Sequence, residues 1–436
     1  MAQKIIRILI TSPHCRPDWI PFLGKESQGG QTVVMNKLSL ALTKVNPSLR
    51  LDLFTRLQDN DYFAKTPISF LDSEKRVRLI RLPAGPTDRY IRKEILYGQY
   101  INQFVQEILK FTKKENIDYQ LLHGHYADGW ETVFKLSKFL NRPYFVTTHS
   151  LGRKKQQDCL QRGMSLAAAN QKFNFKTRIA SEDQSLAKAT IIFVLSSEEK
   201  RFLLKHYPTV KKEKIAIFPN GIDPSQFNFP QTEGFRRRWR QEFLKLLPND
   251  LVFIIPSRQE ERKGQLPALI AWRQFLLQSP PSLPKLKLVL LATQKENDYS
   301  RQLIKFAQQH QLEKSVIFLP PLKREESLRS IFASDIVLLP SQEYFSIAML
   351  EAMYLGRVVV CSRFSGAKDV IKSGENGFLI NHQKESDLVR SYQTTATLSS
   401  AQREAIGHQA NGLIKQKYTW AKLAKKLNEI YAKFIF

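Results

Sequence analysis

Short runs of aliphatic residues recur along the whole chain, and longer amphipathic stretches separate them. The runs do not alternate apolar with polar residues, as Leu251–Ile255 illustrates, and this pattern is typical of strands buried on both faces. Strands that alternate with helices indicate parallel sheets covered by helices, so the predicted fold class is α/β. The predicted strands are 5–11, 51–55, 78–82, 119–123, 144–148, 190–195, 215–218, 251–256, 287–292, 315–319, 335–339 and 357–361.

The chain length predicts two domains, because 436 residues exceed what one hydrophobic core usually holds. Turn-forming residues cluster at 218–224, where neither a helix nor a central strand can continue. We therefore expect an N-terminal domain over 1–220 and a C-terminal domain over 221–415. The last segment, 416–436, repeats apolar residues at helical spacing and should form a helix that packs back on the N-terminal domain.

The net charge of +27, from 67 Lys and Arg against 40 Asp and Glu, favours anionic partners. Nucleic acid, an acidic membrane surface and phosphorylated small molecules all satisfy that condition. The chain has no run of about 18 to 20 apolar residues, which a membrane-spanning helix requires. Cys15, Cys159 and Cys361 are far apart and in no metal-binding spacing, so we expect free thiols in a cytoplasmic protein.

Two glutamates, Glu343 and Glu351, follow the predicted strand 335–339 and are eight residues apart. They can lie on one side of a helix if the segment between them is a turn that enters the helix. A helix start near 345–347 would offer free backbone N–H groups and a positive dipole end to a diphosphate. Taken alone, this spacing fits a structural pair as well as a binding site.

The surrounding residues give the pair its context. Glu343, Glu351-Ala352-Met353, Gly356, Asp369-Val370-Ile371 and Asn376-Gly377 resemble the donor site of the fourth family of retaining glycosyltransferases. That family has the GT-B fold, two Rossmann-like domains that face each other across a cleft. The resemblance implies that Glu343 contacts the transferred sugar, that Glu351 holds the ribose, and that Phe345, Ser346 and Ile347 complete the donor site. Ser346, Arg357 and Ser365-Gly366-Ala367 replace the family's usual Gly, Pro and Gly-Gly-Pro.

A basic loop follows the first predicted strand of the second half, at Ser257–Gly264. It is similar to the family's Arg-x4-Lys pair, which implies that Arg258 and Lys263 bind the diphosphate and stabilise its charge as it leaves. We expect Glu260, Glu261 and Arg262 to be solvated loop charges.

Three segments of the first half resemble sucrose-phosphate synthases: Gly29-Gly30-Gln31, Leu122–Gly129 and Thr147–Lys155. The resemblance implies that His149 contacts the donor sugar and polarises the transition state. Gly30 would let the backbone approach both substrates, and Gln31 would donate to the acceptor. A phosphorylated acceptor also needs a basic pocket. Its expected members are Lys93, Tyr126, Lys155 and Arg178.

These resemblances imply a reaction, namely glucosyl transfer with retention from UDP-glucose to fructose 6-phosphate. A sucrose-phosphate phosphatase would then be a pathway partner. We find no Asp-x-Asp suited to a metal, so we expect no obligatory metal or cofactor, and no specific nucleic acid beyond weak binding to anionic surfaces. Three alternatives stay open: a sucrose synthase that uses free fructose, a mannosylfructose-phosphate synthase that uses GDP-mannose, and an inactive basic protein that binds membranes or nucleic acid.

Overall fold

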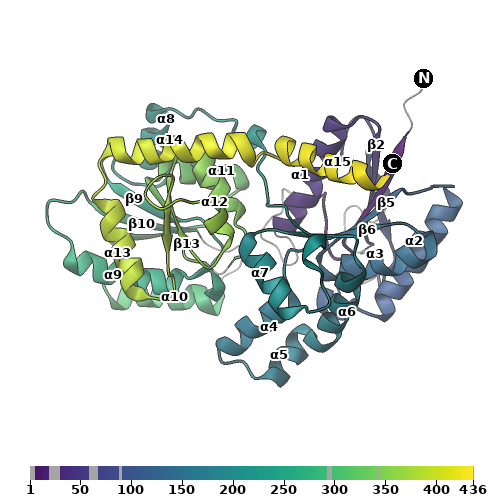
Figure 1. Cartoon of the computed structure of the whole chain (residues 1–436). Coiled ribbons are helices and arrows are strands. Elements are labelled where there is room, and N and C mark those ends of the chain that lie inside the picture. The colour runs from purple at the N-terminus through teal and green to yellow at the C-terminus, as the bar shows by residue number, and fades with distance from the viewer. Residues whose placement is uncertain are drawn as a thin grey trace. The chain divides into compact units, whose positions relative to one another are not determined.

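The computed structural model describes residues 5–18, 30–57, 67–87, 91–291, 297–341 and 343–435 (Figure 1). The described residues divide into two compact units. Unit 1 contains the chain up to Pro219 together with the segment that begins at Trp420, and unit 2 contains Asn220–Thr419.

Unit 1 is built on an eight-stranded sheet in the order β3-β4-β2-β1-β5-β6-β7-β8, in which all neighbours are parallel except β3 and β4. The strands are β1 (Ile6–Thr11), β2 (Leu49–Arg56), β3 (Ile68–Phe70), β4 (Val77–Leu82), β5 (Leu121–His125), β6 (Tyr144–Thr147), β7 (Ile191–Val194) and β8 (Ile215–Ile217). The helices are α1 (Gly30–Val45), α2 (Gln99–Lys114), α3 (Tyr126–Leu140), α4 (Gly152–Gln161), α5 (Leu166–Phe173), α6 (Phe175–Lys188), α7 (Ser197–His206) and α15 (Trp420–Ile435).

Both faces of this sheet are buried, as the apolar runs predict. Leu9, Phe54 and Ile80 belong to a core with residues of α2 and α3, whereas Ile8 and Leu53 belong to a second core with α1 and α15. Neighbouring residues of a strand point to opposite faces, so a run without polar residues supplies both cores.

The C-terminal helix α15 belongs to unit 1, although unit 2 precedes it in the chain. Its buried face presents Trp420, Leu423, Leu427 and Tyr431 at helical spacing, and α15 lies beside α1 (Figure 1). This is the amphipathic helix that the end of the sequence predicts.

Unit 2 is built on a parallel six-stranded sheet in the order β11-β10-β9-β12-β13-β14. The strands are β9 (Leu251–Ile255), β10 (Leu286–Leu291), β11 (Val316–Leu319), β12 (Ile336–Leu339), β13 (Val358–Ser362) and β14 (Phe378–Ile380). The helices are α8 (Glu233–Arg238), α9 (Gln265–Gln278), α10 (Asp298–Gln309), α11 (Arg324–Ala333), α12 (Ile347–Tyr354), α13 (Glu385–Ala396) and α14 (Ser400–Lys417).

The strand orders place the functional loops. In each sheet the order reverses at one point, between β1 and β5 in unit 1 and between β9 and β12 in unit 2. Ligands of open α/β sheets bind outside the carboxyl ends of the strands at such a switch point. Functional residues are therefore expected in the loops after β1, β5, β9 and β12.

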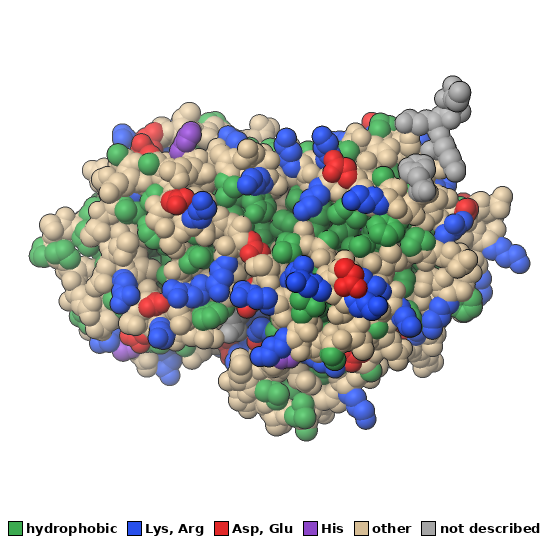
Figure 2. Space-filling view, in the orientation of Figure 1, with side chains coloured by type: hydrophobic (Ala, Val, Ile, Leu, Met, Phe, Trp, Pro, Cys, Tyr) green, Lys and Arg blue, Asp and Glu red, His purple; other side chains and the backbone are tan. Residues whose placement is uncertain are grey.

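All twelve predicted strands are present, and β3 and β14 are two further strands of three residues each. The three cysteines are buried free thiols, as predicted. Among the described helices, none is long and apolar enough to cross a membrane. Lys and Arg side chains are prominent on the face drawn in Figure 2, as the net charge leads one to expect.

Candidate active site

In unit 2, Glu343 and Lys263 meet where two loops approach each other. Lys263 follows β9 and donates to Oε1 of Glu343, which follows β12. The approach depends on Gly264, whose φ is 73° and at which an added Cβ would lie 2.3 Å from the carbonyl oxygen of Pro340. Only glycine fits both the left-handed backbone and this contact.

A second cation, Arg262, also reaches Glu343, and its Nη1 lies 3.4 Å from Oε1. Burial raises the pKa of Glu343, but the charges of Lys263 and Arg262 outweigh burial and lower this pKa to about 2. Burial also lowers the pKa of Lys263, against the opposing effect of Glu343. Glu343 is thus an ionised acceptor at any pH near neutrality.

Arg262 is partly solvated, as the sequence led us to expect, but it also bridges Glu343 and Glu260, which the sequence did not predict. Arg258 lies elsewhere in the same loop. Its guanidinium is 3.1 Å from Glu260, and 39% of its side chain is exposed. The two expected diphosphate ligands thus come from one loop, but only Lys263 contacts Glu343.

Glu351 has a different cation. It is buried inside α12 and pairs with Arg324 at the start of α11, and Arg324 also donates to Gln226 at 3.2 Å. Glu343 precedes the helix, so the two glutamates belong to separate ion pairs. Sequence reasoning missed Arg324, because no local pattern links it to Glu351.

The predicted helix start is confirmed. Ser346 caps α12 by accepting from the backbone N–H of Met349 at 3.4 Å, and the helix begins at Ile347. Phe345 is buried, and its carbonyl accepts from Asn220 at 3.1 Å. Ser346, which stands where the family has glycine, therefore has a capping role here.

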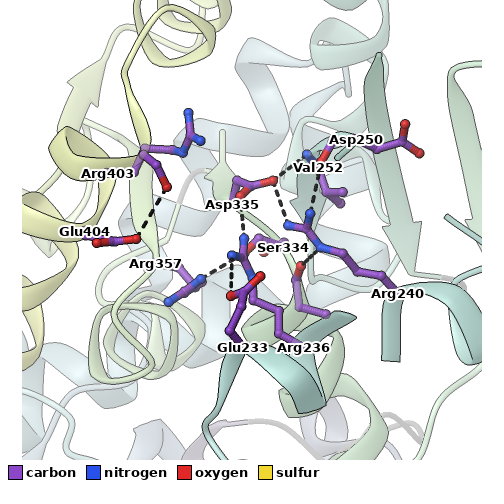
Figure 3. Close-up of polar contacts among 12 residues, drawn as sticks. Glu233, Arg236, Arg240, Asp250, Val252, Ser334, Asp335, Arg357, Arg403 and Glu404 are labelled. Carbon is purple, nitrogen blue, oxygen red and sulfur yellow. Dashed lines mark hydrogen bonds and ion pairs between the residues drawn. The ribbon is translucent and has the colours of Figure 1, made fainter. Parts of the chain in front are cut away.

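The other departures from the family pattern lie in two places. Gly366, in the segment 365–367, donates to the carbonyl of Tyr344 at 2.7 Å, next to Glu343. Arg357 precedes β13, so it lies at the amino-terminal edge of the sheet, away from Glu343. Figure 3 shows it near Asp335, to which Arg240 donates at 2.8 Å.

In unit 1, Tyr126 lies at the centre of the second group. It starts α3 directly after β5 with φ of 64°, a conformation that costs a bulky residue about 1–3 kcal/mol. Its hydroxyl lies 2.8 Å from Nη1 of Arg178, and Nζ of Lys93 lies 4.8 Å from its ring centroid. Lys155 approaches the same group and lies 3.9 Å from Glu94.

The structure thus brings together the four residues expected to bind a phosphate. Burial raises the pKa of Tyr126, but the charges of Arg178, Lys93 and Lys155 lower it further than burial raises it. Burial also lowers the pKa of Lys155 to about 8. The lowered pKa of Tyr126 indicates dense positive charge around its hydroxyl group, whereas that of Lys155 reflects burial of its ammonium group.

Arg178 is held rigidly in this group. It is 2% exposed, and it donates to Glu182 at 2.8 Å and to the carbonyl of Ser150 at 2.7 Å. Glu182 also accepts from the backbone N–H of Gly152 at 2.9 Å. The spacing of Arg178 and Glu182, four residues apart on α6, is the signal that could have revealed Glu182.

His149 follows β6, and its Nε2 lies 3.0 Å from Nδ1 of His125. The His125 ring lies 4.5 Å from that of His123 at a tilt of 31°, and Nδ1 of His123 lies 2.6 Å from the hydroxyl of Tyr431 in α15. Burial lowers the pKa of His125 to about 3, and burial with the neighbouring His125 and His14 lowers the pKa of His149 well below its usual value. Both rings are therefore neutral near pH 7.

Gly30 is the first residue of α1, and Gln31 donates to Ser12 at 2.7 Å. Nδ1 of His14 lies 2.7 Å from Asp128. Sequence reasoning missed His14, and it singled out the segment that contains Asp128 without giving this residue a role. The His14 ring lies 4.8 Å from that of Tyr126, so this chain of contacts ends at the basic group. Gly29 lies outside the described residues.

No group of three or more His, Cys, Asp or Glu in the described part of the chain is arranged to hold a metal ion. The expectation of a reaction without obligatory metal remains a prediction.

Comparison with known proteins places these two groups in a family. Residues 28–226 match the model of Glycosyltransferase Family 4, and residues 236–395 match that of Glycosyl transferases group 1. A probable sucrose-phosphate synthase from Thermosipho melanesiensis is 25% identical, over 91% of this chain and 89% of its own. A mannosylfructose-phosphate synthase from Agrobacterium fabrum is 27% identical, over 98% of this chain and 91% of its own. A D-inositol 3-phosphate glycosyltransferase from Corynebacterium kroppenstedtii is 26% identical, over 98% of this chain and 89% of its own.

Solved structures share the fold. The sucrose-phosphate synthase from Thermosynechococcus elongatus superimposes with a TM-score of 0.79 at 23% identity, covering 98% of both chains. Anabaena HepE in complex with UDP-glucose superimposes with a TM-score of 0.69 at 18% sequence identity, and the match covers 98% of this chain and 100% of the HepE chain. The predicted GT-B architecture is thereby confirmed. The chain is a glycosyltransferase, in which a segment that matches Glycosyltransferase Family 4 is followed by one that matches Glycosyl transferases group 1, and it has the GT-B fold.

Proposed function

We propose that this glycosyltransferase transfers a glucosyl group, with retention, from UDP-glucose to fructose 6-phosphate, and that sucrose 6-phosphate is the product. The observation that carries the proposal is the basic group of unit 1. Lys93, Lys155 and Arg178 surround Tyr126, and cations that come from separate helices can make the charge-assisted bonds that a phosphate monoester requires.

The names of the relatives agree with a phosphate ester. The three relatives described above are named for sucrose phosphate, mannosylfructose phosphate and inositol 3-phosphate. The sugar differs among them, whereas the phosphate is common to all three. The names of the relatives therefore support a phosphorylated acceptor, whereas fructose as the sugar of that acceptor is supported by the sucrose-phosphate synthase relative in particular.

The donor is assigned to unit 2. In the proposal Lys263 and Arg258 neutralise the diphosphate as it leaves, Glu343 accepts from the sugar hydroxyls and Glu351 accepts from the ribose. The backbone of Phe345, Ser346 and Ile347, at the start of α12, adds N–H groups for the phosphates. The complex of HepE with UDP-glucose supports a uridine nucleotide as donor.

Neutral His149 is proposed to contact the donor sugar, because an uncharged imidazole can accept or donate a hydrogen bond without opposing the positive charge of an oxocarbenium-like transition state. Gly30 and Gln31 complete the sites at the start of α1. No metal or cofactor is proposed for the reaction, and the cytoplasm, where both substrates would be available, is the proposed compartment.

The test is a matrix of purified protein with UDP-, ADP- and GDP-glucose and GDP-mannose against fructose 6-phosphate, fructose, inositol 3-phosphate and no acceptor. We expect the highest kcat/KM with UDP-glucose and fructose 6-phosphate, and a product that a sucrose-phosphate phosphatase converts to sucrose. A preference for GDP-mannose or inositol 3-phosphate would replace the proposed substrates with those of the other relatives. Absence of transfer with every pair would contradict the proposed reaction.

A further inference from the structure

A basic cavity of about 200 Å³ lies on unit 1, away from the loops that carry the proposed site. Its lining comes from the starts of β1, β2 and β4 and the end of antiparallel β3, so it lies at the amino-terminal edge of the sheet. Tyr126 and His149 follow the carboxyl ends of β5 and β6. The cavity is lined by Arg7, Arg50, Asp52, Phe70, Lys75, Arg76 and Arg78.

Strand register forces like charges together here. Arg7 of β1 is paired with Arg50 of β2, and Asp52 is paired with Arg78 of β4. Like charges directly opposite each other on neighbouring strands are destabilising. The single carboxylate of the lining is also committed, because both oxygens of Asp52 accept from Arg78 at 2.7 Å.

The remaining acids nearby compensate only part of the charge. Arg76 pairs with Asp72 and Glu74, and Arg78 pairs with Asp52. Counting the described residues alone, the cations of the lining without a close carboxylate are therefore Arg7, Arg50 and Lys75. Arg7 reaches Asp52 only at 4.0 Å, and Arg50 donates to two backbone carbonyls at 2.8 and 3.0 Å.

Lys75 is the most exposed of these three cations. Its ammonium lies 5.8 Å from the centroid of the Phe70 ring, which is itself exposed. Within the described residues, neither Arg50 nor Lys75 has a carboxylate partner. Three cations and an aromatic ring therefore line one cavity with little acid to balance them.

We propose that this cavity binds a phosphate monoester of a small organic molecule. The phosphate would lie among Arg7, Arg50 and Lys75, and the organic part would pack on Phe70. Arginine and lysine bind phosphate through charge-assisted hydrogen bonds, and binding relieves the repulsion between the paired arginines. The volume is below that of typical pockets for drug-sized ligands, so it suits a small phosphate ester better than a nucleotide.

This site is independent of the proposed reaction. None of its residues belongs to the donor or acceptor groups, so a phosphate bound there would remain when acceptor binding is lost. A soluble phosphate ester and the phosphomonoester headgroup of a lipid present the same chemistry, and the experiment below separates these two sources.

The experiment measures binding of inorganic phosphate and glycerol 3-phosphate to the full chain by calorimetry at near-physiological salt. It uses Lys155→Ala as the background, which weakens the proposed acceptor site. Adding Arg50→Gln and Lys75→Gln should weaken the remaining binding at least about tenfold, because two charge-assisted contacts are lost. The matched control adds Lys188→Gln and Lys205→Gln, two exposed lysines of unit 1 outside the cavity, and should leave affinity unchanged.

A parallel arm uses phosphatidylcholine vesicles with and without phosphatidic acid. Binding to the phosphatidic acid vesicles alone, lost in the Arg50→Gln/Lys75→Gln variant, would identify a lipid as the source of the same phosphate chemistry. Equal binding by the cavity and control variants in both arms would overturn the proposal, as would binding that disappears at physiological salt, which marks nonspecific attraction. Thermal unfolding of each variant confirms that the fold is intact.

Discussion

His125 Nδ1 and His149 Nε2 lie 3.0 Å apart, and the two rings stack with centroids 5.3 Å apart. Because both histidines are neutral, one proton lies between these nitrogens and one ring acts as the donor. The contact therefore orients the His149 ring and couples its tautomer to that of His125. The His123 ring contacts that of His125, and His123 also bonds to Tyr431 of the C-terminal helix.

Replacing His125 should thus impair catalysis through His149. We expect His125→Leu to lower kcat about ten- to a hundredfold with little change in the KM of the donor, since a small displacement of a catalytic group is enough for such a loss. His125→Asn keeps a polar atom near the position of Nδ1 and should retain most of kcat. Steady-state kinetics of the two variants checks this, and equal losses in both would assign His125 a packing role only.

The ion pair of Glu343 with Lys263 should matter for the chemical step. We expect Glu343→Gln and Lys263→Ala each to lower kcat at least about a hundredfold, the scale of losing one preorganised electrostatic contact. Glu261→Ala, in the same loop but without contact to Glu343, is the matched control and should keep normal turnover. Near-normal kcat for both site variants at saturating donor would make this pair structural.

Arg178 should be important for stability as well as for binding. Arg178→Ala leaves the carboxylate of Glu182 buried without its cation, and this should lower the free energy of unfolding by about 3–5 kcal/mol. The double variant Arg178→Ala/Glu182→Gln should recover part of the loss. Arg153→Ala removes a half-exposed pair with Asp183 and should cost at most about 1 kcal/mol. Urea-induced unfolding measures all three, and equal costs for Arg178→Ala and Arg153→Ala would contradict the buried-pair account.

The depressed pKa of Lys155 predicts a pH dependence with a definite sign. The ammonium is charged below a pKa of about 8 and loses its charge as the pH rises through that value. Because kcat/KM reports the free enzyme, kcat/KM for a phosphorylated acceptor should fall above about pH 8. Lys155→Arg keeps its charge and should remove this fall, whereas hydrolysis of the donor without acceptor should show no such dependence in either protein. An identical profile for Lys155→Arg and the unaltered chain would exclude Lys155 as the titrating group.

The strands were predictable because burial on both faces leaves a continuous apolar signal, as in Leu251–Ile255. The strand β3 was missed because its apolar residues Ile68 and Phe70 are exposed and belong to no buried run. The strand β14 was missed although it is no shorter than β8, which was predicted. The motif residues of the candidate site were likewise visible in the sequence. Their partners were not, since Arg324 meets Glu351 only through the packing of α11 against α12.

The contact of Arg262 with Glu343 was likewise not predictable from the sequence. Its neighbours in the loop are charged, so the sequence favours a solvated residue, yet the close approach of Gly264 to Pro340 brings Arg262 to Glu343. Contacts made across two loops depend on backbone geometry that a local pattern does not carry.

The most direct test of the account is the ratio of kcat/KM for fructose 6-phosphate to that for fructose, measured with the unaltered chain and with Lys155→Ala. The account predicts a strong preference of the unaltered chain for the phosphorylated sugar. It also predicts that this preference falls about ten- to a hundredfold in Lys155→Ala, the cost of one charge-assisted contact. Donor hydrolysis should change little. A preference of the unaltered chain for free fructose, or a preference for the phosphate that Lys155→Ala leaves intact, would contradict the assignment of the basic group as the acceptor site.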